Sequence, residues 1–266
     1  MNIEHWKMKS IVIAAGYATR LYPLTENFPK PLLKIGDSTI LDRLLDDVDQ
    51  IDEVTEHIVV TNHKFAHIFE KWAKERVAPK KPSPEEKSET RGCEVAKKPI
   101  TIIDDGTTTN EGRLGAVRDL LLAIKEGHAE EDNLLVMAGD NLLDFSMKGF
   151  VEYFKEKHSS VIMCHNETSI EKLQRTGVIT VDDNMRVLDM EEKPREPKSH
   201  WAVPPFYIYT REDLPLIMDC MNHGCGMDAP GSLARYLVGV STLHAWPMPG
   251  KRHDIGTMDS YLEVKD

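Results

Sequence analysis

The chain has 266 residues, of which 41% are hydrophobic and 29% are charged, and this composition is typical of a folded globular protein rather than a disordered or fibrous one. Its 44 acidic residues outnumber its 33 Lys and Arg residues, so the formal net charge is −11. This excess of negative charge disfavours general binding to nucleic acid or to an anionic membrane surface. A phosphorylated ligand would therefore have to be held by local cations, backbone N–H groups or a metal ion.

The sequence carries no sign of export or of membrane insertion. Residues 1–10 contain no apolar stretch of the kind found in a secretory signal, and no apolar run approaches the ~18 residues of a membrane span. The four Cys residues are scattered, which argues against a zinc ribbon and fits a reducing compartment. We expect a cytoplasmic protein that binds neither nucleic acid nor membranes, and a homo-oligomer is compatible with the sequence.

In the first half of the chain, short apolar runs alternate with segments of helical period. The apolar runs have the length and composition of buried strands and cover residues 9–15, 57–61, 99–103 and 134–138. Apolar residues recur at helical spacing in the segments 41–48, 65–72 and 114–124. Alternation of this kind predicts right-handed crossovers and an α/β fold with a mainly parallel sheet.

The second half contains shorter strands and is typical of a mixed sheet with interspersed helices. Its predicted strands cover residues 161–164, 177–181, 186–190 and 206–209. Asp182-Asp183-Asn184 predicts a hairpin turn between the second and third of these strands.

Residues 74–98 are rich in Lys, Glu and Pro and poor in apolar side chains. We expect a solvated insertion there, centred on residues 77–98, within a single domain that spans residues 1–266. The sequence leaves open whether this insertion covers a binding site, contacts another subunit or stays free in solvent.

Ligands of α/β sheets bind beyond the carboxyl ends of the strands, so the residues that follow each predicted strand form the candidate site. The first strand is followed by the small residues Ala14, Ala15 and Gly16, whose backbone N–H groups could cradle a phosphate. Arg20 adds a permanently charged fork of donors. Pro29-Lys30-Pro31 is expected to hold a second cation in an extended segment. The loop lacks the Gly-x-Gly-x-x-Gly pattern of dehydrogenases and the Gly-Lys-Ser/Thr of P-loops.

Acidic residues follow later strands. Asp140 comes directly after the fourth predicted strand, where a carboxylate is well placed to hold a hard divalent cation. Asp254 is a second isolated acid, in a loop before a predicted helix. At residues 191–194 the motif Glu-Glu-Lys-Pro follows another strand. An extended backbone would place Glu192 and Lys193 on opposite faces, with either one in the cleft.

Taken in order, these motifs resemble those of the sugar-1-phosphate nucleotidyltransferase family. The motifs are AAGYATRLYPLT at 14–25, PKPLL at 29–33, AGDN at 138–141, EEKP at 191–194 and HDIGTMDSY at 253–261. The resemblance implies a Rossmann-like three-layer sandwich around a mixed, mainly parallel sheet, with a sugar-binding lobe. It also implies a Mg²⁺-dependent reaction in which a nucleoside triphosphate and a sugar 1-phosphate give a nucleotide sugar and pyrophosphate. The sequence stops soon after HDIGTMDSY, so we expect the short form, without the C-terminal β-helix domain of larger relatives.

The resemblance also implies roles for individual residues. Those near the nucleotide are Ala14, Ala15, Gly16, Asp105, Gly112 and Gly115. Those near the acceptor are Gly177, Glu192 and Lys193. The catalytic cations, which neutralise or bind the reacting phosphates, are Arg20, Lys30 and Lys193. The Mg²⁺ ligands are Asp140 and Asp254.

The substrates stay open at this stage. The nucleotide is dTTP, UTP or CTP by resemblance, and the acceptor is a phosphorylated small molecule. Tyr17 and the Pro204-Pro205 pair depart from the residues common in relatives, and His253 replaces a common Trp. These departures keep an alternative open, in which CTP activates phosphocholine, an aminoalkylphosphonate or a polyol phosphate. A catalytically silent subunit is the minor alternative. It is disfavoured because the charged residues to which the resemblance assigns catalysis or metal binding are all present, namely Arg20, Lys30, Asp140, Lys193 and Asp254.

Overall fold

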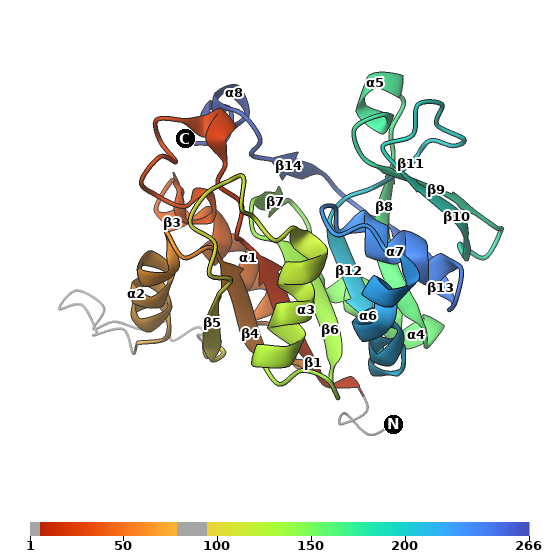
Figure 1. Cartoon of the computed structure of the whole chain (residues 1–266), viewed down its shortest axis with the longest axis horizontal. Coiled ribbons are helices and arrows are strands. Elements are labelled where there is room, and N and C mark those ends of the chain that lie inside the picture. The colour runs from red at the N-terminus through yellow and green to blue at the C-terminus, as the bar shows by residue number, and fades with distance from the viewer. Residues whose placement is uncertain (1–5, 79–94, 266) are drawn as a thin grey trace, which may run out of the picture.

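The computed structural model describes residues 6–78 and 95–265, which form an α/β sandwich around one large sheet (Figure 1). The strands of this sheet are β1 (Met8–Ile13), β4 (Val54–Thr61), β5 (Ile100–Asp104), β6 (Asn133–Ala138), β8 (Ser160–Asn166), β9 (Gly177–Val181), β10 (Val187–Glu192), β11 (Trp201–Val203), β12 (Phe206–Tyr209) and β13 (Leu243–Pro247). Their order is β10-β9-β11-β8-β12-β6-β1-β4-β5, and β13 pairs with β8. The pairs β6-β1, β1-β4 and β4-β5 are parallel, whereas the neighbours from β6 to β10 along this order pair antiparallel. The sheet is therefore mixed with a parallel half, as predicted.

Helices cover both faces of the sheet. The helices are α1 (Ile40–Val48), α2 (Ala66–Val77), α3 (Ala116–Glu126), α4 (Lys148–Lys157), α5 (Ile170–Leu173), α6 (Leu214–Asp219), α7 (Gly231–Val238) and α8 (Met258–Leu262). Apolar residues of α3, α6 and α7 pack in one core cluster, and those of α1, α2 and α4 pack in another. Because neighbouring strand residues face opposite sides, Ile11 belongs to the first cluster and Val12 to the second. Two apolar cores on either side of one sheet make the three-layer sandwich.

Short elements complete the fold. The 3₁₀ helices are η2 (Thr19–Leu21), η3 (Lys30–Leu32), η4 (Arg211–Asp213) and η5 (Cys220–His223), and two small sheets pair β2 (Lys34–Ile35) with β3 (Ser38–Thr39) and β7 (Asn141–Leu143) with β14 (Arg252–Asp254). In the part of the chain that the structure describes, no helix is long and apolar enough to cross a membrane.

The predicted elements are present, with ends shifted by a few residues. All four apolar runs of the first half form strands, and all three periodic segments form helices. Thr39 caps α1 by accepting the N–H of Asp42 at 3.0 Å. The predicted hairpin joins β9 to β10, and Asp182 Oδ1 accepts the N–H groups of Asn184 and Arg186, both at 2.9 Å.

The predicted insertion begins too early at residue 74, because α2 continues to Val77. Its last residues are not simply solvated, since Lys97 pairs with Asp46 at 2.6 Å and with Asp49 at 3.4 Å. Residues 79–94 lie outside the described part of the chain.

Asp49 ties the edge of the parallel sheet to its helices. Its carboxylate, in the turn after α1, contacts Arg76 of α2 at 2.7 Å and His57 Nε2 of β4 at 3.0 Å. The other ring nitrogen of His57 lies 2.6 Å from Ser10 Oγ on β1. The hydrogen bonds and positive charges hold the pKa of Asp49 at about 2 despite its burial. Burial lowers the pKa of His57 below its ordinary 6.5 even though Asp49 opposes this shift.

We expect the free energy of unfolding to fall between pH 7.5 and pH 5.5 on account of His57, by at most about 1.4 kcal/mol. In this range the unfolded chain takes up a proton at His57 more readily than the folded chain, whose His57 pKa is lowered by burial, so the unfolded state binds more protons and is favoured as the pH falls. Urea unfolding at the two pH values measures the difference. His57→Gln should reduce the pH dependence, whereas His67→Gln, at an exposed position on α2, should leave it unchanged. Equal pH dependence in wild type and His57→Gln would contradict this assignment.

Candidate functional site

A cavity of about 260 Å³ lies at the carboxyl ends of β1 and β6. Its walls come from the loop after β1, from η3, from the start of α3 and from Ala138 and Asp140 at the end of β6. The lining residues are Ile13, Ala14, Ala15, Gly16, Ala18, Lys30, Pro31, Arg113, Gly115, Ala116, Asp119, Ala138, Asp140 and Asp228. The structure thus brings Ala14, Ala15, Gly16, Lys30, Gly115 and Asp140 together as the sequence predicts.

The loop after β1 is held in place by its neighbours on the sheet. Ala14 N–H donates to the carbonyl of Val60 at 2.9 Å. Asn62 is fully buried, and its side-chain N–H₂ donates to the carbonyl of Ala15 at 3.0 Å. Gly16 is exposed, and a Cβ there would meet no atom within 4 Å, so the backbone at this point is open to a ligand. Sequence analysis missed Asn62, although an Asn directly after a buried strand is a signal for such a role.

Lys30 is the centre of the polar contacts in the cavity. Its ammonium pairs with Asp140 Oδ2 at 2.6 Å and donates to the carbonyl of Ile255 at 2.5 Å. The prediction that Lys30 lies in an extended segment is wrong, because it begins the 3₁₀ helix η3, with Pro31 as the second residue. Pro is compatible with the first turn of a helix, where a backbone N–H has no partner to lose.

Asp140 and Asp254 come from distant parts of the chain and lie on paired segments. Asp254 ends β14, which pairs antiparallel with β7 so that Asp254 is opposite Asn141. The N–H of Ile255 donates to the main-chain oxygen of Asp140 at 3.3 Å. Asp254 is exposed, and its nearest cation, Arg252, is 3.9 Å away.

These two carboxylates fit the requirements of Mg²⁺. This ion usually takes one or two carboxylates, retains several waters and uses substrate phosphates as further ligands. Within residues 6–78 and 95–265, no group of three or more His, Cys, Asp or Glu side chains forms a complete protein site for a metal. Asp140 and Asp254 are therefore suited to a cation that arrives with a phosphorylated ligand.

Arg20 lies farther out than the sequence suggests. It is an exposed residue of η2, just after Ala18, whose φ is +48°. Arg20 is not among the lining residues, and it makes no hydrogen bond or ion pair with another residue that the structure describes. Its guanidinium is available to an anion that extends out of the cavity.

Of the three residues between 105 and 115 that are expected near the nucleotide, only one lies in the cavity wall. Gly115 is the N-cap of α3 and lines the cavity, whereas Gly112 and Asp105 are not among the lining residues. Asp105 Oδ1 accepts the backbone N–H and the hydroxyl of Thr107, both at 2.7 Å. Burial raises the pKa of Asp105 above its ordinary value.

Glu192 and Gly177 are neighbours on the β9-β10 hairpin, opposite each other in register. A Cβ on Gly177 would lie 3.2 Å from Glu192 Oε2 and 2.8 Å from the methyl carbon of Met190, so the side chains of β10 already fill the space over Gly177. Gly231, at the start of α7, is closer still, since a Cβ there would lie only 2.1 Å from the same carboxylate oxygen. Burial raises the pKa of Glu192.

Lys193 follows Glu192 but leaves the strand. Its φ is +51°, so the expected extended backbone that would place Glu192 and Lys193 on opposite faces ends at Glu192. The Lys193 N–H donates to the carbonyl of Thr176 at 3.0 Å, and its exposed side chain pairs with no described residue. The two side chains therefore do not lie on opposite faces of one strand: Glu192 is half-buried at the end of β10, and Lys193 is exposed after it.

The segment before α7 connects the hairpin region to the cavity. The N–H groups of Ala116 and Val117 donate to the carbonyls of Asp228 at 3.3 Å and Met227 at 3.0 Å. The side chain of Arg113 pairs with that of Asp228 at 3.3 Å. Residues 227–231 thus run from the cavity wall to the carboxylate of Glu192.

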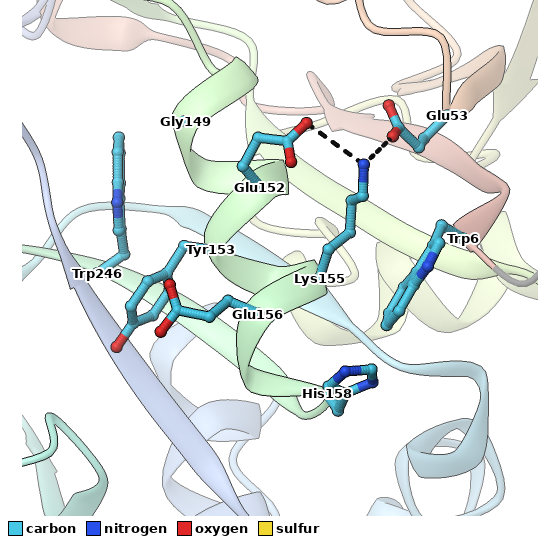
Figure 2. Close-up of a pocket in the computed structure, with 9 residues that line it drawn as sticks. All are labelled: Trp6, Glu53, Gly149, Glu152, Tyr153, Lys155, Glu156, His158 and Trp246. Atoms are coloured by element: carbon cyan, nitrogen blue, oxygen red, sulfur yellow. Dashed lines mark hydrogen bonds and ion pairs between the residues drawn. The ribbon is translucent and has the colours of Figure 1, made fainter. Parts of the chain in front are cut away.

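A larger cavity, of about 800 Å³, lies elsewhere (Figure 2). It runs along α4 from Gly149 to His158, and Trp6 and Glu53, just before β1 and β4, place one end of it at the amino ends of the parallel strands. Figure 2 shows the Lys155 ammonium between Glu53 and Glu152, at 2.6 and 3.3 Å. Open α/β sheets bind their ligands at the opposite edge, which favours the smaller cavity as the functional site.

Comparison with known proteins identifies the family. The profile of the nucleotidyl transferase family matches residues 9–266, and the chain belongs to this family. The chain is 24% identical over 267 residues to the glucose-1-phosphate adenylyltransferase of Fervidobacterium nodosum, covering 96% of this chain and 59% of that enzyme. It is 25% identical over 268 residues to the UTP–glucose-1-phosphate uridylyltransferase of Haloferax volcanii, covering 97% and 94% of the two chains.

The fold has solved counterparts. A UDP-glucose pyrophosphorylase complexed with UDP-glucose matches with a TM-score of 0.77 at 20% identity, over 97% of each chain. The family and fold expected from the sequence are confirmed, and the relatives are sugar-1-phosphate nucleotidyltransferases. The chain spans about three fifths of the length of the adenylyltransferase.

We expect Gly115→Ala to destabilise the fold by about 1–3 kcal/mol. Gly115 has a φ of +92°, and a Cβ would lie 2.6 Å from the carbonyl oxygen of Met227, so both the backbone and the contact oppose a side chain. Urea unfolding measures the loss. Gly112→Ala is the matched control, because its Cβ would meet Thr109 Oγ1 at an ordinary 3.4 Å. Similar stabilities for the two variants would contradict this account of Gly115.

Proposed function

We propose that this chain is a Mg²⁺-dependent nucleotidyltransferase that couples a nucleoside triphosphate to a sugar 1-phosphate and releases pyrophosphate. The observation that carries the proposal is the contact of Lys30 with Asp140 at 2.6 Å beside the open backbone of residues 14–16. A cation, a carboxylate and a close-approach loop at one end of the sheet are the groups that phosphoryl chemistry needs. Family membership supports the same reaction class.

The reaction needs no protein nucleophile, because a phosphate oxygen of the acceptor is already an anion. That oxygen attacks the α-phosphorus in line and forms the new P–O bond, while the bond to the departing pyrophosphate breaks. Catalysis then consists of positioning and of neutralising the charge of two anions that approach each other. We assign the nucleotide to the loop of Ala14, Ala15 and Gly16, through the N–H groups of Ala15 and Gly16, because the Ala14 N–H already donates to Val60. We assign the charge of the triphosphate to Lys30 and Arg20.

The metal would be held by Asp140 and Asp254. Bound there, Mg²⁺ would supply positive charge that neutralises the phosphates and makes the α-phosphorus more electrophilic. Lys30 pairs with Asp140 at 2.6 Å, so this ammonium would exchange the carboxylate for the phosphates when the metal takes Asp140. Lys30 and the metal would thus both neutralise the negative charge of the phosphates.

We assign the acceptor to the β9-β10 hairpin. Lys193 is exposed and unpaired among the described residues, which suits contact with the incoming phosphate. Glu192 is half-buried against Gly177 and Gly231, and its carboxylate would accept hydrogen bonds from sugar hydroxyls. The names of the relatives make glucose 1-phosphate the first acceptor to test, with dTTP, UTP or CTP as the nucleotides that the motifs suggest.

Asp140→Ala and Lys193→Ala are each expected to lower turnover about 100-fold or more, by analogy with the loss of one transition-state contact. Both variants should keep the wild-type unfolding midpoint. Lys198→Ala is the matched control, because this lysine is exposed and pairs only with Asp189 among the described residues, at 2.9 Å. Near-normal turnover in either site variant would refute the assigned role.

Pyrophosphate release measures the reaction itself. The purified protein would be given ATP, CTP, GTP, UTP or dTTP with a panel of acceptors, with and without Mg²⁺. The panel contains sugar 1-phosphates, phosphocholine, aminoethylphosphonate and polyol phosphates. Release that requires both Mg²⁺ and a sugar 1-phosphate is the expected result. Pyrophosphate release only with phosphocholine, aminoethylphosphonate or a polyol phosphate would show that the acceptor is not a sugar 1-phosphate. No pyrophosphate release from any pair of substrates would contradict the proposed reaction.

A further inference from the structure

Asp119 is a buried carboxyl in the wall of the proposed nucleotide cavity, and no described residue forms a hydrogen bond or ion pair with it. It lies in the first turn of α3 and is only 4% exposed. Its Oδ1 is shielded from solvent and has no hydrogen-bond partner among the described residues. Its neighbours on the buried face of α3 are apolar, including Val117, Leu120 and Ala123. A carboxyl in such a place destabilises the empty protein unless something else uses it.

A second carboxyl lies close enough to act on Asp119. Asp105 uses Oδ1 on Thr107, but its Oδ2 is buried without a partner in the described part of the chain. Burial and the charge of Asp105 together raise the pKa of Asp119 to about 7. Burial, together with the negative charges of Asp105, Asp104 and Glu111, also raises the pKa of Tyr17, which lies next to the lining residue Gly16. This part of the site is rich in acceptors and carries a negative potential.

Such a region cannot receive the triphosphate, which is an anion and has its own partners in Lys30 and the loop 14–16. It suits a part of the nucleotide that donates hydrogen bonds. Adenine, cytosine and guanine carry an exocyclic amino group, whereas uracil and thymine present carbonyl oxygens beside a single ring N–H. A carboxyl oxygen accepts from an amino group and repels a carbonyl oxygen. Even a protonated Asp119 retains one acceptor oxygen, and the surrounding carboxylates disfavour a carbonyl.

We propose that Asp119 is a specificity-determining residue that accepts a hydrogen bond from the exocyclic amino group of the nucleobase, so that this chain selects ATP, CTP or GTP over UTP and dTTP. The inference rests on the proposed function for the placement of the nucleotide. Of the three nucleotides that the motifs suggest, only CTP meets the requirement.

Titration calorimetry with each nucleotide and Mg²⁺ tests the proposal on the intact protein. We expect at least one of ATP, CTP and GTP to bind about tenfold more tightly than UTP and dTTP, which corresponds to one hydrogen bond gained or lost. Equal affinities, or tighter binding of UTP or dTTP, would overturn it. CTP and dCTP should bind within about threefold of each other. A preference that follows the ribose hydroxyl instead of the base would assign Asp119 to the sugar and also overturn the proposal.

Asp119→Asn provides the matched substitution. The amide is the same size but adds a donor, which can meet the carbonyl of uracil, so the preference over UTP should shrink about tenfold. Glu126→Gln, an exposed carboxyl at the other end of the same helix, should leave the ratio unchanged. An unchanged ratio in Asp119→Asn would reject the role of Asp119.

The two proposals fail in different ways. Nucleotide binding with the expected base preference but without pyrophosphate release would refute the reaction and retain the assignment of Asp119. Pyrophosphate release that is fastest with UTP or dTTP would support the reaction and refute the assignment. Absence of binding by every nucleotide would overturn both.

Discussion

The site depends on the parallel pairing of β1 with β4 on one side and β6 on the other. In this register Ile13 lies opposite both Val60 and Ala138, so all three strands end together at one edge. The loop after β1, Asn62 after β4 and Asp140 after β6 are therefore neighbours, and the contact of Asn62 with Ala15 then holds the loop in place. A shift of one residue in either pairing would turn the strand faces over and remove both apolar cores. The strand register that buries the two apolar cores is consequently the same register that brings the polar groups of the site together.

Around this edge, positive charge is scarce and negative charge is abundant. Lys30 is the lining cation paired with Asp140, and Arg113, the other, pairs with Asp228. Carboxyls surround them, and two of these, Asp105 and Asp119, are buried with an oxygen that no described residue uses. The chain as a whole is acidic, so the proposed binding of phosphates would depend on a few fixed cations and backbone N–H groups rather than on the net charge of the protein.

Sequence reasoning predicts the parts of this structure that depend on local pattern. The apolar runs of β1, β4, β5 and β6 are unambiguous because buried parallel strands are apolar on both faces. The residues after them then follow from the rule that ligands bind at the carboxyl ends of strands. The left-handed conformation of Lys193 and the 3₁₀ helix at Lys30 were not predictable, because both arise where the chain must turn to meet a distant segment.

The burial of Asp119 was also beyond prediction, for a different reason. Asp119 stands among helical residues, and a polar side chain in the first turn of a helix is ordinarily exposed and favoured by the helix dipole. Only the packing of α3 against β1 and β4 shows that this face is covered. Asn62 differs, because its place directly after a buried strand is a signal in the sequence, but its partner Ala15 lies 47 positions away and is known only from the fold.

The contact between Lys30 and Asp140 means that the protein carries its own counterion where a divalent cation would bind. A bare cation entering the site has to displace an ammonium that already satisfies the carboxylate. A cation that enters together with a triphosphate meets less resistance, because the phosphates offer the displaced ammonium a new partner. If the proposed reaction holds, this contact would disfavour loading by free metal, and the cation would be acquired as part of the nucleotide complex rather than bound in advance.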